Sequence, residues 1–128
     1  MRVAKILAVD DEADFELLIT QRFRRQIRAR EFDFRFARHG EEALAALAAE
    51  PDIDLMPLDI NMPGMDGLEL LHVIKERRPD LPAMMVTAYG DDDRRGRAAQ
   101  LGAVGFLTKP VDFDLLKAHL QRLPMGSG

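Results

Sequence analysis

Two kinds of apolar segment alternate along the chain. Short, nearly continuous apolar runs are typical of strands that are buried on both faces of a sheet. Segments in which apolar residues recur every three or four positions are typical of amphipathic helices. The runs predict five strands, at about residues 3–9, 32–36, 53–58, 82–88 and 103–107. The periodic segments predict five helices, at about residues 15–27, 40–50, 66–78, 91–101 and 112–123.

This alternation indicates the fold class. Parallel strands need long crossover connections, and the helices between the runs supply them. We therefore expect one α/β domain, a doubly wound five-stranded parallel sheet with five helices. Residues 1–123 would form the domain, and residues 124–128 would be a disordered tail. Pro57 predicts either a local irregularity in the third strand or a backbone N–H position that faces away from any partner, because a proline inside a central strand has no N–H group to donate.

Length and composition exclude several kinds of protein. The 128 residues fit a single domain, and the formal net charge of −4 argues against general affinity for nucleic acid. The absence of cysteine excludes disulfides, thiol nucleophiles and thiolate metal sites. No apolar run approaches the roughly 20 residues that span a bilayer. The first residues do not have the form of a secretion signal, so we expect a cytoplasmic location.

Acidic residues follow two of the predicted strands. Asp10 and Asp11 come after the first strand and Asp59 after the third. In an open parallel sheet the ligand crevice lies at the carboxyl ends of the strands, so these acids converge if their strands are neighbours. Two carboxylates about 4 Å apart repel by about 4 kcal/mol at an effective dielectric of about 20. Such a group needs a cation or a retained proton, and oxygen ligands at a half-open site suit Mg²⁺.

Polar residues also end the fourth and fifth predicted strands. Thr87 supplies a hydroxyl group and Lys109 an ammonium group. Opposite a metal-loaded carboxylate, these two donors can receive the oxygens of a phosphoryl group. Asp10 and Asp11 alone could simply begin a helix, where the macrodipole favours acids. That interpretation does not account for Thr87 and Lys109.

Four short segments carry this pattern, in the order Asp10-Asp11-Glu12, residues 58–67 (LDINMPGMDG), Val86-Thr87-Ala88 and residues 106–110 (FLTKP). In composition and spacing they resemble the receiver domains of two-component response regulators, the CheY-like family. The resemblance covers about residues 3–123. It implies a flavodoxin-like sheet with strand order 2-1-3-4-5. It also implies a signalling switch of a phosphorelay rather than a turnover enzyme.

The resemblance assigns the phosphoryl chemistry to Asp59. This residue would accept a phosphoryl group from a histidine of a sensor histidine kinase or phosphotransfer protein, giving an aspartyl phosphate. Mg²⁺ would be held by Asp10, Asp11, Asp59 and the backbone carbonyl of Asn61. Neither membrane association nor direct binding of nucleic acid by the domain is implied.

Thr87 and Lys109 would each contact an oxygen of the phosphoryl group. Thr87 would then move toward the phosphate and Phe106 would turn inward, biasing a two-state element. The face formed by the fourth helix, fifth strand and fifth helix would change and control an output domain or partner protein. A second copy of the domain, docked through this face, is a further candidate partner. The peptide between Lys109 and Pro110 would be cis, as X-Pro bonds allow.

Two other functions share features with this pattern. A phosphohydrolase of the haloacid dehalogenase type also uses an aspartate nucleophile, but that family resembles an Asp-x-Asp pattern after its first strand. Here Asp59 is followed by Ile60 and Asn61, so the second aspartate is missing. A flavin or nucleotide binder would need a glycine- or hydroxyl-rich loop after the first strand. Acids stand there instead.

The end of the first predicted helix is strongly basic, with Arg22, Arg24, Arg25, Arg28 and Arg30. A solvated helix face is the simpler interpretation. A docking surface for an acidic partner is the alternative.

Overall fold

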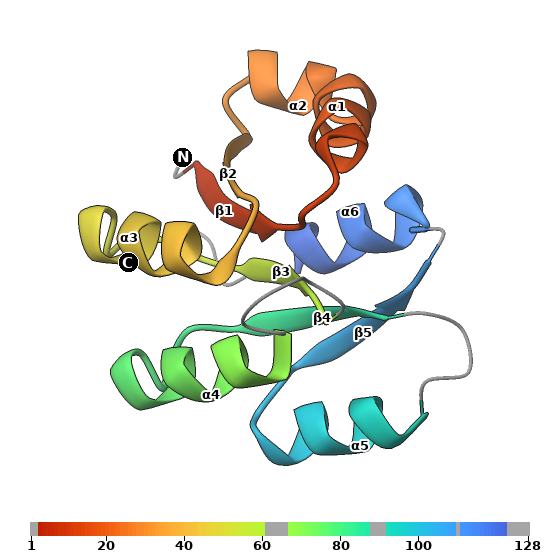
Figure 1. Ribbon diagram of the computed structural model, residues 1–128. Helices are drawn as coiled ribbons and strands as arrows, with labels where there is room; N and C mark the ends of the chain where they lie inside the picture. Colours follow the sequence, from red (N-terminus) through yellow and green to blue (C-terminus); the bar gives the residue numbers. More distant parts are fainter. Residues whose placement is uncertain (1–2, 61–66, 88–91, 110, 123–128) are drawn as a thin grey trace.

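A computed structural model of the protein describes residues 3–60, 67–87, 92–109 and 111–122. A central sheet lies between two layers of helices (Figure 1). The strands are β1 (Ala4–Val9), β2 (Phe32–Ala37), β3 (Met56–Asp59), β4 (Ala83–Thr87) and β5 (Gly105–Thr108). The helices are α1 (Ala13–Arg22), α2 (Arg24–Arg28), α3 (Gly40–Ala49), α4 (Gly67–Arg77), α5 (Asp92–Gln100) and α6 (Phe113–Gln121).

The sheet has the predicted order, β2-β1-β3-β4-β5, and all neighbouring strands are parallel. Helices cover both of its faces. One buried cluster joins the sheet to α3, α4 and α5, and the other joins it to α1 and α6. The doubly wound α/β fold is therefore confirmed. Within the described ranges, no helix combines the length and apolar character needed to cross a membrane.

The number of helices differs from the prediction, since the described residues form six helices rather than five. The segment expected as one helix breaks at Phe23, whose φ is −105° and ψ 22°. The ring of Phe23 packs against the rings of Phe32, Phe34 and Phe113, with centroids 5.7, 5.6 and 6.2 Å away. This aromatic cluster, which joins residues distant in sequence, outweighs the helical periodicity and directs the short helix α2 away from the axis of α1.

The expected irregularity at Pro57 is confirmed. β3 pairs along its whole length with β4, but with β1 it pairs only at Leu55 and Leu58. Met56 donates its backbone N–H to the carbonyl of Pro82, on the β4 side, at 3.0 Å. Because successive residues of a strand point their N–H groups to opposite neighbours, the missing N–H of Pro57 faces β1.

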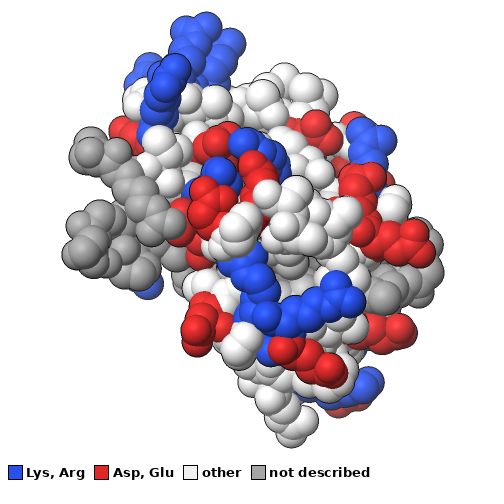
Figure 2. Space-filling model, turned by 90° about the vertical axis from the view of Figure 1, so that its left-hand side faces the viewer, with Lys and Arg blue, Asp and Glu red and all other residues white. Residues whose placement is uncertain are grey.

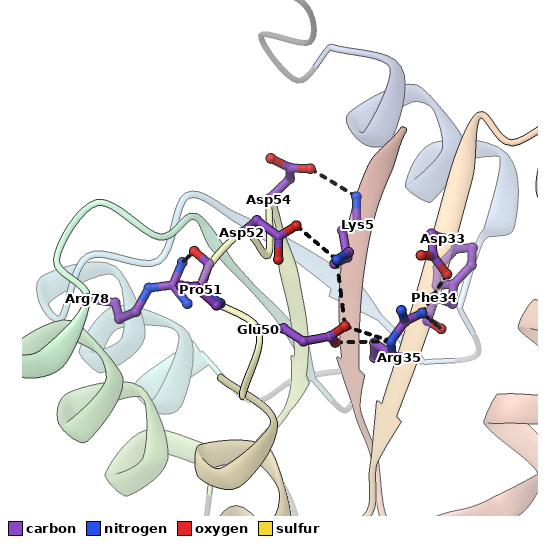
Figure 3. Close-up of polar contacts among 9 residues, drawn as sticks. All are labelled: Lys5, Asp33, Phe34, Arg35, Glu50, Pro51, Asp52, Asp54 and Arg78. Atoms are coloured by element: carbon purple, nitrogen blue, oxygen red, sulfur yellow. Dashed lines mark hydrogen bonds and ion pairs between the residues drawn. The ribbon is translucent and has the colours of Figure 1, made fainter. Parts of the chain in front are cut away.

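At the end of the sheet where β1 begins, charged side chains pair with one another (Figure 3). Lys5 Nζ lies 2.8 Å from Asp52 Oδ2 and 3.6 Å from Glu50 Oε1. Arg35 Nε lies 3.0 Å from Glu50 Oε2, and its guanidinium also contacts Asp33. These contacts join the connection between α3 and β3 to the two strands β1 and β2.

Candidate functional site

The polar residues identified at strand ends lie at the opposite edge of the sheet. Asp10 directly follows β1, Asp59 and Thr87 are the last residues of β3 and β4, and Lys109 directly follows β5. The strands β1, β3 and β4 are neighbours. Parallel strands bring their carboxyl ends to one edge, which explains why these side chains meet.

Lys109 lies at the centre of the group. Its Nζ is 3.0 Å from Asp59 Oδ2, 3.6 Å from Asp10 Oδ2 and 3.5 Å from Glu12 Oε1. Burial lowers the pKa of Lys109, but the hydrogen bond and charge of Asp59 and the charges of Asp10 and Glu12 outweigh it, so that the pKa is raised. The side chain therefore carries a positive charge at neutral pH and faces three acids.

Asp10 is a buried carboxylate with an incomplete set of partners. Asp10 is only 5% exposed to solvent, and Asp59 is only 1% exposed. Asp10 Oδ1 accepts the backbone N–H of Glu12 at 2.9 Å. Asp10 Oδ2 accepts no hydrogen bond from the part of the chain that the structure describes. Burial raises the pKa of Asp10 to about 6, although the Glu12 N–H opposes it, and the charge of Asp59 adds to the rise.

Three acids after β1 could hold a metal ion. Asp10, Asp11 and Glu12 each bring a carboxylate oxygen within 4.8 Å of the others, and the last two are exposed. An all-oxygen set with room for water suits a hard divalent cation. The buried Asp10 Oδ2, which accepts no hydrogen bond from any described residue, is an oxygen that such a cation would satisfy. Asn61, which was expected to add a carbonyl, lies outside the described residues.

Thr87 brings a buried hydroxyl group to the end of β4. Its side chain is fully buried, and its Oγ1 makes no hydrogen bond within the described ranges. The carbonyl of Thr87 accepts the backbone N–H of Lys109 at 2.8 Å, which links the two residues through the main chain. An unpaired buried hydroxyl costs about 1–3 kcal/mol, so a new acceptor near it would be stabilising.

Phe106 is partly buried against the same core as α5. The guanidinium of Arg95 lies over its ring, 5.5 Å from the centroid. Arg95 also donates from Nη2 to Thr108 Oγ1 at 3.0 Å. Arg95 of α5 thus contacts two residues of β5, one of which is the residue expected to switch. Ala88, Tyr89 and Pro110, including the expected cis peptide, lie outside the described residues.

Gly67 is a residue of the site that sequence reasoning missed. A Cβ atom there would lie 2.4 Å from the carbonyl oxygen of Asp59 and 2.5 Å from Ile60 Cα. The N–H of Gly67 donates to the carbonyl of Ile60 at 2.8 Å. The start of α4 therefore packs directly on the backbone of the acceptor residue, which only glycine allows. The sequence marks Gly67 only as a glycine beside a predicted helix start, not as a contact of Asp59.

Comparison with known proteins gives consistent results. Residues 6–121 match the family model described as the response regulator receiver domain. The chain is 42% identical over 113 residues to the response regulator protein PilR of Pseudomonas aeruginosa, an alignment that covers 88% of this chain and 24% of PilR. It is 32% identical over 124 residues to the sporulation initiation phosphotransferase F of Bacillus subtilis, with 96% of each chain covered.

The chain spans about a quarter or less of the length of the first curated relatives, which are PilR and the NtrC transcriptional regulators. Among solved structures, the chemotaxis protein CheY4 of Vibrio cholerae superposes with a TM-score of 0.81 at 28% sequence identity. That superposition covers 94% of this chain and 98% of CheY4.

Proposed function

This chain belongs to the receiver domains of response regulators, and from this premise we propose that it is a phosphoacceptor switch of a two-component phosphorelay. Asp59 accepts a phosphoryl group from a phosphorylated histidine of a sensor kinase or phosphotransfer protein. The observation that carries the proposal is the contact of Lys109 Nζ with Asp59 Oδ2, at 3.0 Å, beside the acids that follow β1.

In the transfer, a carboxylate oxygen of Asp59 forms a bond to phosphorus. The bond between phosphorus and the histidine nitrogen breaks, and its electron pair stays on the imidazole. The product is an aspartyl phosphate, a mixed anhydride. Lys109 then pairs with a phosphoryl oxygen, and the hydroxyl of Thr87 donates to another. The domain promotes its own phosphorylation and dephosphorylation without being a turnover enzyme.

Mg²⁺ is the metal that we propose for this reaction, and Asp10, Asp11, Asp59 and the backbone carbonyl of Asn61 would hold it. It would supply positive charge that neutralises the acids and orients the phosphoryl oxygens. Asp10 supports this role, because its buried Oδ2 accepts no hydrogen bond from the described residues and burial raises its pKa to about 6. The single positive charge of Lys109 compensates only part of the negative charge of the two buried carboxylates, Asp10 and Asp59.

The signal leaves the domain through Thr87 and Phe106. When Thr87 turns to the phosphate, Phe106 moves inward, and the face formed by α5, β5 and α6 changes. That face controls an output domain or partner protein and is also the surface through which two copies would pair. Residues 1–123 form this receiver unit, and the protein acts in the cytoplasm. The expected tail, residues 124–128, lies outside the described residues.

A hollow beside the site provides a place for the phosphodonor protein. It has a volume of about 220 Å³. Its charged lining residues are Asp10, Glu12, Asp14 and Lys109, and its apolar lining residues are Phe15, Leu18, Val111 and Phe113. An apolar helix face that carries a phosphohistidine could dock there with its phosphoryl group next to Asp59. Apolar pockets with a few polar groups at one end are typical binding sites.

The test is incubation with acetyl phosphate and Mg²⁺, followed by intact mass measurement. We expect one phosphoryl adduct per chain, stable in acid and labile in base, which is lost in Asp59→Asn and on removal of Mg²⁺. The exposed-acid variant Asp93→Asn serves as a control that keeps the adduct. Turnover of many phosphate esters without an adduct would contradict the proposal and favour a phosphohydrolase.

A further inference from the structure

Four exposed arginines form a compact surface at the end of the sheet remote from Asp59. We call this the arginine surface: Arg24, Arg25 and Arg28 of α2, and Arg30, which follows it. Arg24 and Arg25 precede Arg28 by four and three residues, spacings that make each of them a neighbour of Arg28 on the surface of α2. Residues 22–30 contain no acid, whereas the whole chain has a formal net charge of −4.

The arginine surface is unfavourable for folding. Like charges one helical turn apart, as in Arg24 and Arg28, destabilise a helix. Arg30 has a φ of 58°, in the left-handed region where glycine is strongly preferred. The hydrogen bonds from Arg30 N to Ile27 O (3.1 Å) and from Glu31 N to Gln26 O (2.8 Å) close the end of α2 around it. Stability alone would favour glycine there.

The side chains of the arginine surface form no ion pair with any residue that the structure describes. The contrast with the adjacent edge of the sheet is clear, since Lys5 and Arg35 are both paired with acids there (Figure 3). In Figure 2, basic side chains project at the top of the molecule, where α1 and α2 lie in Figure 1, while red and blue groups are interspersed below. The charge of the arginine surface is therefore available to a partner.

A hollow lined by three apolar and two charged residues adjoins these arginines. Its volume is about 310 Å³, and it is lined by Val3, Ile27, Arg30, Phe32 and Asp33. Arg30 stands at the junction of the two features, because its left-handed backbone conformation ends α2 and its side chain lines the hollow. A ligand could therefore place an apolar group in the hollow and anionic groups over α2.

We propose that the arginine surface is a docking site for an acidic segment of a partner protein, in which one apolar side chain enters the hollow and the flanking carboxylates pair with the arginines. A nucleic acid duplex or an anionic membrane fits less well, because each would also cover acids of the same edge. Glu31 and Asp33 follow the arginines directly, and Asp52 and Asp54 lie nearby on that edge. The proposal does not depend on phosphorylation of Asp59.

The experiment measures binding of a fluorescein-labelled peptide that has glutamates on both sides of one central leucine. Fluorescence anisotropy is recorded at low salt and at about 0.15 M salt. The double variant Arg24→Gln/Arg28→Gln removes two charges from the surface. The matched control, Arg77→Gln/Arg97→Gln, removes two charges from exposed positions of α4 and α5. Arg30→Gly removes the guanidinium and also removes the cost of the left-handed backbone conformation at this residue. Thermal melting verifies that each variant is folded.

We expect the peptide to bind more weakly as salt increases, and about 3- to 10-fold more weakly to the Arg24/Arg28 double variant. The control variant should bind as the wild type does, and replacing the leucine of the peptide with serine should weaken binding. Arg30→Gly should bind less tightly while melting at a higher temperature. Equal binding by both double variants, no binding by the wild type, or tighter binding of duplex DNA or phosphatidylserine vesicles through these arginines would overturn the proposal.

Discussion

Replacing Asp10 with asparagine should make the metal-free domain more stable at neutral pH. Burial raises the pKa of this carboxyl from 3.8 to about 6. At about 1.4 kcal/mol for each tenfold change in the proton dissociation constant, the charged form costs about 3 kcal/mol of folding free energy above pH 6. Asparagine carries no charge, but its amide would stand near Lys109 in place of an anionic oxygen. A gain of about 1–3 kcal/mol is therefore expected.

The sign of the pH dependence follows from the raised pKa. Between about pH 4 and pH 6 the folded protein keeps a proton on Asp10 that the unfolded chain has lost, so this residue lowers stability progressively as pH rises through that window. The assay is urea denaturation in EDTA, at a series of pH values, for the wild type and Asp10→Asn. The difference in unfolding free energy between the two proteins should grow from pH 4 to pH 6 and then stay constant.

Mg²⁺ and a second variant complete this test. Mg²⁺ should stabilise the wild type increasingly as its metal site becomes saturated, and it should stabilise Asp10→Asn much less. The difference in unfolding free energy between the two proteins should therefore narrow. Asp11→Asn, a change at an exposed acid of the same loop, should alter metal-free stability by less than about 0.5 kcal/mol. If Asp10→Asn destabilises the metal-free domain at neutral pH, or if its effect is the same at every pH, the reasoning from burial is wrong.

Two further substitutions test the backbone near Asp59. Gly67→Ala should lower the unfolding free energy by about 1–3 kcal/mol, because the new Cβ would meet the Asp59 carbonyl at 2.4 Å. Gly96→Ala, in the interior of α5 where no atom lies close to the new Cβ, should raise the unfolding free energy by up to about 1 kcal/mol. Equal effects of the two substitutions in urea denaturation would refute the close-approach argument. Pro57→Val should restore an N–H directed at β1 and raise the unfolding free energy by about 1 kcal/mol. An unchanged or lower urea midpoint would show that the proline is not a strain.

Much of the site could be predicted because the positions of its residues follow from the order of strands and helices along the chain. Continuous apolar runs separated by helical segments require parallel strands, and a polar residue at the end of such a run must lie at the carboxyl edge. This reasoning predicts that Asp10, Asp59 and Lys109 lie together, and the structure has Lys109 Nζ 3.0 Å from Asp59 and 3.6 Å from Asp10. It could not place Glu12 within reach of Lys109, since the direction of an exposed side chain depends on the loop and not on the strand pattern.

The features that sequence reasoning missed depend on contacts between distant residues. The helix break at Phe23 results from packing against Phe32, Phe34 and Phe113, while the local periodicity continues through it. The need for glycine at position 67 results from its approach to the backbone of β3. Neither the aromatic packing of Phe23 nor the close approach of Gly67 to β3 can be predicted from the periodicity of apolar residues.

The most direct test of the central claim is to locate the phosphoryl group on the chain. After incubation with acetyl phosphate and Mg²⁺, borohydride reduces an aspartyl phosphate to homoserine, and tandem mass spectrometry of the digested protein identifies the converted position. We predict conversion at residue 59 alone, dependent on Mg²⁺. Conversion at another acid, or none at residue 59 in folded protein with Mg²⁺ present, would contradict the account.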